Sequence, residues 1–316
     1  MATTDLSISA TFFSMKTFIL LIFLAGATLA APQYPPELPG TELETYKKVS
    51  GVQLKIWIYN PDEHQTSDKK PAVVFFFGGG WKSGSPGQFH HQCRYLASRG
   101  VVAMTADYRV ANRQGTKAVS CVEDGKSAVR WIRENAGRLG VDPDRVAAGG
   151  GSAGGHVAAA MGIIKDFDAK EEDRKVSSTP NALLLFNPAV TLADINDQYT
   201  FPSEKAASME DRAGVPPLKL SPYHHVRKNL PPTIIFHGTN DSAVDHRTVV
   251  LFEKAMREKG NRCELVSFKD KPHGFFNYGK FGNEPFHESM LATDNFLSSL
   301  GWIKGKPTID QYLKTQ

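Results

Sequence analysis

The sequence has little of what defines several large classes of protein. Its 316 residues contain three cysteines, Cys93, Cys121 and Cys263, so at most one disulfide can form and a disulfide-stapled scaffold is excluded. The chain has no C-x-x-C pair, no cluster of metal-ligand residues and no internal repeat. We therefore expect one domain that needs neither a metal nor a cofactor.

Charge of one sign is also scarce. Lysine and arginine number 37 against 33 aspartates and glutamates, and the resulting net charge of +4 is spread among acids rather than clustered. A nucleic-acid-binding surface needs a concentrated basic patch, so we expect no nucleic-acid partner. With 41% hydrophobic and 22% charged residues, the composition is ordinary for a globular protein.

An apolar run near the N-terminus is too short to span a bilayer comfortably. It extends from Phe18 to Leu24, follows Lys16, and is followed by small residues up to Ala30 and Ala31. This arrangement is typical of a secretory signal peptide. We expect a signal peptide at 1–30, a secreted or periplasmic mature protein, and no stable membrane association. An uncleaved membrane anchor is the alternative.

Beyond this run, short apolar segments alternate with amphipathic ones. Strands are predicted at 52–59, 72–77, 101–105, 145–149, 182–186, 233–237 and 263–268. Helices are predicted at 88–98, 119–135, 153–164, 245–259 and 285–300. Such alternation predicts an α/β fold with a mostly parallel sheet and helices on both faces.

The domain boundaries follow from the same pattern. A proline-rich linker is expected at 31–45, the domain at 46–302 and a C-terminal tail at 303–316. Between about 189 and 231 the periodicity is lost. A long irregular insertion in a compact domain is usually functional or disordered, and we expect a small cap here.

The sharpest motif is Gly149-Gly150-Gly151-Ser152-Ala153-Gly154-Gly155. It contains G-x-S-x-G where a predicted strand meets a predicted helix, the context of a nucleophile elbow with an exposed serine hydroxyl. The glycines also match the dinucleotide-binding pattern G-x-G-x-x-G. That match is weak, because the strand is internal and no ribose-binding acid follows. We predict that Ser152 is a nucleophile.

Backbone donors for an oxyanion are expected on both sides of Ser152. The loop Phe77-Gly78-Gly79-Gly80-Trp81 follows a buried strand, and a glycine-rich loop there can turn N–H groups toward the nucleophile. The N–H of Ala153, at the start of the following helix, is the second candidate. A simple tight turn is the alternative interpretation of the loop.

An acid and a histidine follow in the required chain order. Asp241 comes after the strand at 233–237, and His273 comes after the strand at 263–268. Both therefore lie at the carboxyl edge of the sheet, as Ser152 does, and the order Ser, Asp, His is that of the α/β hydrolases. His273 would accept the serine proton, and Asp241 would fix its tautomer.

Other candidate residues have simpler explanations. Asp245 is a rival for the acid, but an acid at the start of a helix is a good N-cap. His237 ends a strand and is interpreted as structural. His156 lies one helical turn beyond Ser152 and is interpreted as a packing residue. We expect no metal site at the adjacent histidine pairs His90-His91 and His224-His225.

Taken together, the motifs resemble the α/β-hydrolase superfamily. F-G-G-G-W, Asp107-Tyr108-Arg109, Asp142-Pro143-Asp144-Arg145 and G-G-S-A-G-G-H carry the resemblance over residues 50 to 300. The branch that they resemble is that of the bacterial acetyl-xylan-esterase and feruloyl-esterase-like carboxylesterases, near the hormone-sensitive lipase group. The resemblance implies that Gly79 and Gly80 supply oxyanion N–H groups beside Ala153.

Two positions depart from the family patterns. Phe77 stands where the glycine loop usually begins with histidine, a side chain that braces the loop. Gly150 stands where the lipase group usually has aspartate, which favours the esterase branch.

The resemblance implies a serine carboxylesterase acting on small or polysaccharide-linked esters of the acetyl or feruloyl type. Two alternatives stay open. One is a secreted peptidase of the prolyl-oligopeptidase type, although 316 residues leave no room for the usual propeller. The other is a non-catalytic binding protein on the same fold. The oligomeric state is left open.

Overall fold

The computed structural model describes residues 1–3 and 34–316, and Pro35–Gln316 form one compact unit. The apolar run of the expected signal peptide lies outside the described residues, so the export of the chain stays a prediction that N-terminal sequencing of the exported protein would test. No helix in the described part has the length and apolar character needed to cross a membrane.

One eight-stranded sheet runs through the unit in the order β1-β2-β4-β3-β5-β6-β7-β8. The β1–β2 and β2–β4 pairs are antiparallel, and every later pair is parallel. This confirms the mostly parallel sheet. The strands are β1 Glu42–Val49, β2 Val52–Tyr59, β3 Lys70–Phe76, β4 Val102–Ala106, β5 Val141–Gly151, β6 Ala182–Phe186, β7 Thr233–Gly238 and β8 Cys263–Phe268.

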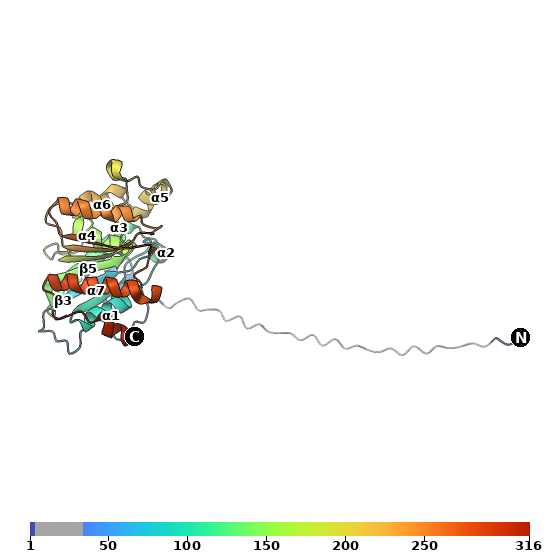
Figure 1. Ribbon diagram of the computed structural model, residues 1–316, viewed down its shortest axis with the longest axis horizontal. Coiled ribbons are helices and arrows are strands. Elements are labelled where there is room, and N and C mark those ends of the chain that lie inside the picture. Colours follow the sequence, from blue (N-terminus) through green and yellow to red (C-terminus); the bar gives the residue numbers. More distant parts are fainter. Residues whose placement is uncertain (4–33) are drawn as a thin grey trace. The chain divides into compact units, whose positions relative to one another are not determined.

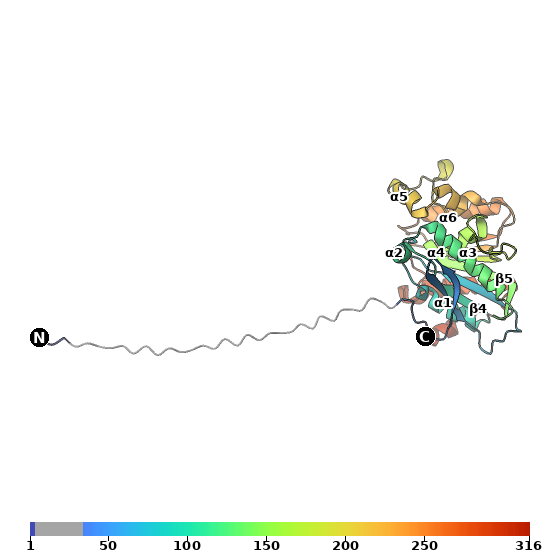
Figure 2. The same ribbon diagram turned by 180° about the vertical axis from the view of Figure 1, so that it is seen from behind.

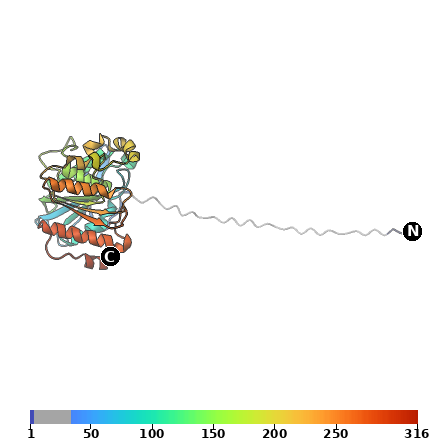
Figure 3. The same ribbon diagram turned by 45° about the horizontal axis from the view of Figure 1, so that its top comes forward.

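Helices cover both faces of this sheet, as predicted (Figures 1 and 3). Helices α3, α4 and α6 pack on one face, and α1, α7 and α8 pack on the other. The α-helices are α1 His90–Ser98, α2 Ala111–Gln114, α3 Ala118–Glu134, α4 Ala153–Ile163, α5 Ser203–Ala213, α6 His246–Glu258, α7 Glu284–Ser299 and α8 Ile309–Lys314. Short 3₁₀ turns are η1 Pro86–Phe89, η2 Asn196–Gln198, η3 Pro217–Leu220, η4 Pro222–His225 and η5 Phe281–Asn283.

The cap predicted at about 189–231 holds α5 and three of the 3₁₀ turns (η2, η3 and η4). Figures 1 and 2 show α5 near α6, at one end of the domain. Two prolines of this region begin 3₁₀ turns: Pro217 is the first residue of η3, and Pro222 is the first residue of η4. Proline suits the first position of a helical turn because its N–H would be unpaired there.

Two boundary predictions are wrong. The linker expected at 31–45 already contains the start of β1, which pairs with β2 from Glu42 onward. The side chains of this edge strand are mostly exposed or half-buried, so no apolar alternation marked it. The tail expected at 303–316 contains α8, whose Tyr312 is buried and donates a hydrogen bond to the His91 carbonyl at 3.1 Å.

The three cysteine thiols are free and buried, so the single disulfide that the sequence allowed does not form. Burial raises the pKa of the Cys93 and Cys121 thiols well above its ordinary range. Thiols in such apolar surroundings are unreactive and behave as small hydrophobic side chains.

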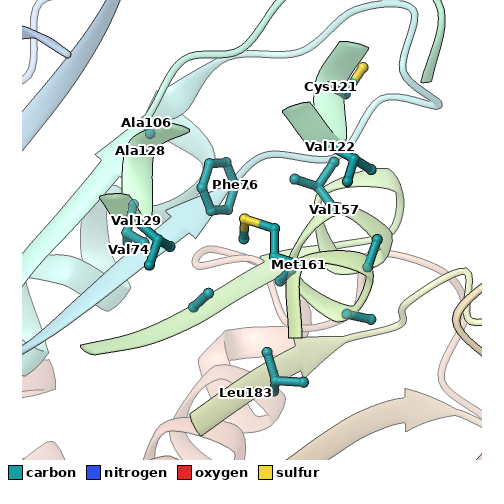
Figure 4. Close-up of a cluster of buried hydrophobic side chains, with 14 of the residues drawn as sticks. Val74, Phe76, Ala106, Cys121, Val122, Ala128, Val129, Val157, Met161 and Leu183 are labelled. Atoms are coloured by element: carbon teal, nitrogen blue, oxygen red, sulfur yellow. The ribbon is translucent and has the colours of Figure 1, made fainter. Parts of the chain in front are cut away.

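The core on the α3 and α4 side is a close-packed apolar cluster (Figure 4). Met161 and Val157 of α4 point toward Phe76 of β3 and the apolar side of α3. A glycine in α3, Gly125, allows this approach, since a Cβ there would lie 2.7 Å from both the Met161 sulfur and a Val157 methyl carbon. The cluster anchors α4 against the centre of the sheet.

The first turn of α4 approaches the sheet more closely than any side chain would allow. A Cβ on Gly154 would overlap the carbonyl oxygens of Phe76 and Phe77, and one on Gly150 would overlap the backbone of Gly154. These are the flanking glycines of G-x-S-x-G. The motif is therefore required by packing, because only glycine fits at both positions.

We predict that Gly154→Ala destabilises the fold by about 1–3 kcal/mol or more, because the overlapping atoms are backbone and cannot rotate away. Urea unfolding measures the change. Gly137→Ala is the matched control, since a Cβ there meets nothing within 4 Å, and its stability should equal or slightly exceed that of the wild type. Equal stabilities of the two variants would contradict the packing argument.

Candidate active site

Ser152 occupies a sharp turn between β5 and α4. Its backbone angles are φ 53° and ψ −114°, a conformation that is strained for a residue with a Cβ. The turn is held from both sides: the Ser152 N–H donates to the Phe186 carbonyl, and the Ser152 carbonyl accepts from the His156 N–H, both at 2.9 Å. This geometry fits the nucleophile elbow that the sequence predicts.

Asp241 has a buried carboxylate that accepts four hydrogen bonds. Oδ1 accepts from the N–H groups of Ala243 and Val244, both at 2.8 Å. Oδ2 accepts from His273 Nδ1 at 2.7 Å and lies 3.2 Å from His237 Nε2. Burial alone would raise the pKa of Asp241, but the hydrogen bonds from His237 and His273 hold it well below its ordinary value. The carboxylate is therefore ionised, and all its acceptor positions are used.

His273 lies in the loop after β8 and is partly exposed to the cavity. Because its Nδ1 faces a carboxylate, that nitrogen carries the proton, and Nε2 is left as an acceptor. The loop is fixed by Asn187, whose buried Oδ1 accepts from the Gly274 N–H at 2.9 Å. Asn187 directly follows β6, next to the carbonyl that holds Ser152. The end of β6 therefore positions both Ser152 and the loop that carries His273.

The glycine loop turns sharply beside Ser152. Gly79, Gly80 and Trp81 all have positive φ, at 126°, 63° and 61°. The Gly78 N–H donates to Gln88 Oε1 at 2.6 Å. By contrast, in the described part of the chain, the N–H groups of Gly79 and Gly80 donate to no protein acceptor. The N–H of Ala153, the first residue of α4, likewise has no intrahelical acceptor.

Phe77 braces this loop at the position where the family resemblance implies histidine. Its ring stacks on Tyr108 with centroids 4.2 Å apart, and its carbonyl accepts from the Tyr108 hydroxyl at 2.6 Å. The Arg113 guanidinium lies 5.6 Å from the centroid of the same ring. The loop therefore has an aromatic brace in place of a polar one.

The rival residues Asp245 and His156 have structural roles. Asp245 caps α6 and accepts from the Arg247 N–H at 2.9 Å, as expected. His156 is fully buried; its Nε2 lies 2.8 Å from the Leu220 carbonyl, and its Nδ1 accepts from the Trp81 indole at 3.3 Å. It packs between the glycine loop and the cap, which confirms the packing interpretation.

His237 does more than the sequence suggested. Besides its contact with Asp241, Nε2 lies 2.9 Å from the Val244 carbonyl, so the ring ties both ends of the acid-bearing loop together. No sequence pattern indicated this, because a histidine at a strand end is common and its partner is set by how the loop folds back.

A cavity of about 550 Å³ joins these features. Five of the six predicted site residues line it, namely Gly79, Gly80, Ser152, Ala153 and His273, whereas Asp241 lies beneath its wall. Residues of the predicted cap complete the wall, although no sequence pattern singled them out individually. They are Ala189, Thr191, Leu192, Tyr199, Phe201, Pro202, Lys205, Met209 and Arg212. Among the described residues no group of three or more histidine, cysteine, aspartate or glutamate side chains could hold a metal ion.

Comparisons with known proteins agree with this arrangement. The BD-FAE family model matches residues 56–256. Carboxylesterase NlhH of Mycobacterium tuberculosis is 26% identical over 278 residues, which cover 81% of this chain and 82% of NlhH. These matches confirm the family resemblance seen in the sequence.

A solved relative is more similar. Esterase 2 of the planctomycete Thermogutta terrifontis, with butyrate bound, is 48% identical with a TM-score of 0.83, and the match covers 87% of this chain and 100% of that one. Its propionate-bound form has a TM-score of 0.82 at the same identity and covers 87% and 99% of the two chains. The chain therefore belongs to the BD-FAE family, and its fold and its relatives are those of the α/β-hydrolase carboxylesterases.

Proposed function

We propose that this carboxylesterase works through an acyl-enzyme on Ser152, with His273 as general base and Asp241 as the acid that orients it. The observation that carries the proposal is the 2.7 Å hydrogen bond between Asp241 Oδ2 and His273 Nδ1, at the wall of the cavity that Ser152 also lines. Because that bond fixes the imidazole, Nε2 is the nitrogen available to the serine hydroxyl.

In this mechanism Ser152 Oγ attacks the ester carbonyl carbon while its proton passes to His273 Nε2. The N–H groups of Gly79, Gly80 and Ala153 stabilise the resulting oxyanion. The tetrahedral intermediate then breaks its bond to the alcohol oxygen, which takes the proton from His273. Water repeats the sequence on the acyl-serine, releasing the carboxylic acid and restoring the serine hydroxyl.

Esters of small acyl groups are the proposed substrates, with esters of the acetyl or feruloyl type as the first candidates. The resemblance to acetyl-xylan-esterase and feruloyl-esterase-like enzymes supports this choice. The propionate and butyrate bound in the related esterase 2 structures also support a short acyl chain. The cavity wall is mostly apolar, with Met209, Phe201, Leu192 and Phe276 among its residues, and can accommodate an aliphatic or aromatic acyl group.

We predict that removal of the nucleophile or the base abolishes turnover. Ser152→Ala and His273→Ala should each lower kcat on 4-nitrophenyl acetate by at least about 10⁴-fold, because the members of a triad act as a unit. Circular dichroism and the melting temperature check that each variant is folded. A folded variant that retains activity within tenfold of the wild type would contradict the assignment.

A second pair of variants tests which acid is used. Asp241→Asn should lower kcat by about 10⁴-fold, because an amide beside Nδ1 favours the wrong imidazole tautomer. Asp245→Ala removes the N-cap of α6 and should cost about 1 kcal/mol of stability with little change in kcat. If kcat collapses in the Asp245 variant and survives in the Asp241 variant, the orienting acid is Asp245.

The acyl preference has its own test. Values of kcat/KM for 4-nitrophenyl acetate and butyrate should exceed that for octanoate by at least about tenfold, since one misfitting methylene is worth about 1–3 kcal/mol. Acetylated xylan and methyl ferulate then separate the two candidate substrate types. A maximum at octanoate would contradict the short-acyl proposal and leave the triad assignment intact.

A further inference from the structure

One face of α5 forms a wall of the active-site cavity. Pro202, Lys205, Met209 and Arg212 all line the cavity, and they recur every three or four residues. That spacing places them on a single side of the helix. Met209 lies between the two cations and is almost fully buried. The face therefore presents an apolar centre flanked by two positive charges.

Each cation touches a loop that carries part of the active site. Lys205 Nζ donates to the Ala243 carbonyl at 2.9 Å, beside Asp241. Arg212 Nη2 lies 3.4 Å from the Gly80 carbonyl, and its guanidinium lies 5.4 Å from the centroid of the Trp81 ring. The two cations thus reach two different loops of the cavity wall.

Neither charge is neutralised. Both acceptors are uncharged carbonyls, and within residues 34–316 neither Lys205 nor Arg212 forms an ion pair with a carboxylate. The Nε atom of Arg212 is buried and has no hydrogen-bond partner. Partly buried cations are normally paired, because an unpaired charge next to apolar surface loses its hydration without compensation.

The nearby carboxylates are already engaged elsewhere. Asp211, the neighbour of Arg212 in sequence, pairs with Lys117 at 2.6 Å. Asp245 also lines the cavity; its Oδ1 caps α6, and it forms no ion pair with Lys205 or Arg212. The four acceptor positions of Asp241 are occupied. Within the described part of the molecule, neither cation of the α5 face is therefore paired with a carboxylate.

We propose that the α5 face selects esters that carry a carboxylate on the portion of the substrate lying against it, with either Lys205 or Arg212 as the cation that binds this carboxylate. The proposal rests on the proposed function, because the ester must sit at Ser152 for the second group to reach α5. The planar guanidinium of Arg212 has donors left for a carboxylate, and Met209 packs against the connecting carbons.

Because the two cations touch different loops, the carboxylate belongs either to the acyl group or to the alcohol. Two substrate pairs separate these cases. On the alcohol side, 4-acetoxybenzoate is compared with 4-acetoxybenzamide. On the acyl side, the 4-nitrophenyl monoester of adipic acid is compared with the same ester of adipic acid monoamide. Each pair differs in charge and hardly in shape, so the ratio of the two kcat/KM values isolates recognition of the charge.

The wild-type ratio should favour the anionic member of at least one pair. Arg212→Met or Lys205→Met should lower that ratio by about tenfold, the usual effect of removing a charge-assisted hydrogen bond. Arg212→Lys and Lys205→Arg, which keep the charge, should restore part of it. The ratio should also fall as salt rises, because ions screen the attraction. Lys254→Met is the matched control: Lys254 lies on α6, its side chain is 63% exposed, and the ratio should not change.

Two results would overturn the proposal. One is a wild-type ratio at or below one for both pairs. The other is an equal fall for the anionic and neutral members in the methionine variants, which would mean that Lys205 and Arg212 only hold the loops of Ala243 and Gly80 in place. Hydrolysis of the neutral esters that survives in Ser152→Ala would instead refute the proposed mechanism, so the two failures are distinguishable.

Discussion

The active site depends on how closely the first turn of α4 approaches β3. No side chain fits at Gly150 or Gly154, because a Cβ at either position would overlap backbone atoms. With α4 held at that distance by the apolar cluster beneath it, the chain can leave β5 only through a tight turn. Ser152 must therefore adopt a strained positive φ, which lifts its side chain toward the cavity. The strain of one residue is compensated by the packing of a whole helix.

The site holds one buried anion, Asp241, and two cations, Lys205 and Arg212, and their charges are compensated in different ways. The buried Asp241 carboxylate is ionised because two backbone N–H groups and two histidines donate to it, and His237 supplies the donor that the usual description of a triad omits. Hydrogen bonds of this kind offset the cost of taking a carboxylate out of water. The two cations of α5 have no such compensation from protein carboxylates. The site thus combines an anion whose acceptor positions are filled with two cations that donate only to uncharged carbonyls.

Much of this could be predicted from the sequence, for a physical reason. Buried strands are short apolar runs, and β2, β6 and β8 begin and end where the pattern predicted. Ser152, Asp241 and His273 each follow a strand, so the topology of a parallel sheet brings them to one edge. The edge strand at Glu42–Val49 was missed because it is largely exposed and carries no apolar alternation. The contact of His237 with Asp241 and the α5 wall depend on how loops fold back, which local sequence does not encode.

The central claim is that the strained serine is the reacting nucleophile. Labelling the folded protein with a fluorophosphonate, followed by peptide mapping by mass spectrometry, tests it most directly, because such reagents capture only a serine whose hydroxyl is activated. We expect one adduct per chain on the peptide that contains Ser152, and no adduct when His273 is replaced by alanine. An adduct on a different serine, or none on an enzyme that is actively hydrolysing esters, would contradict it.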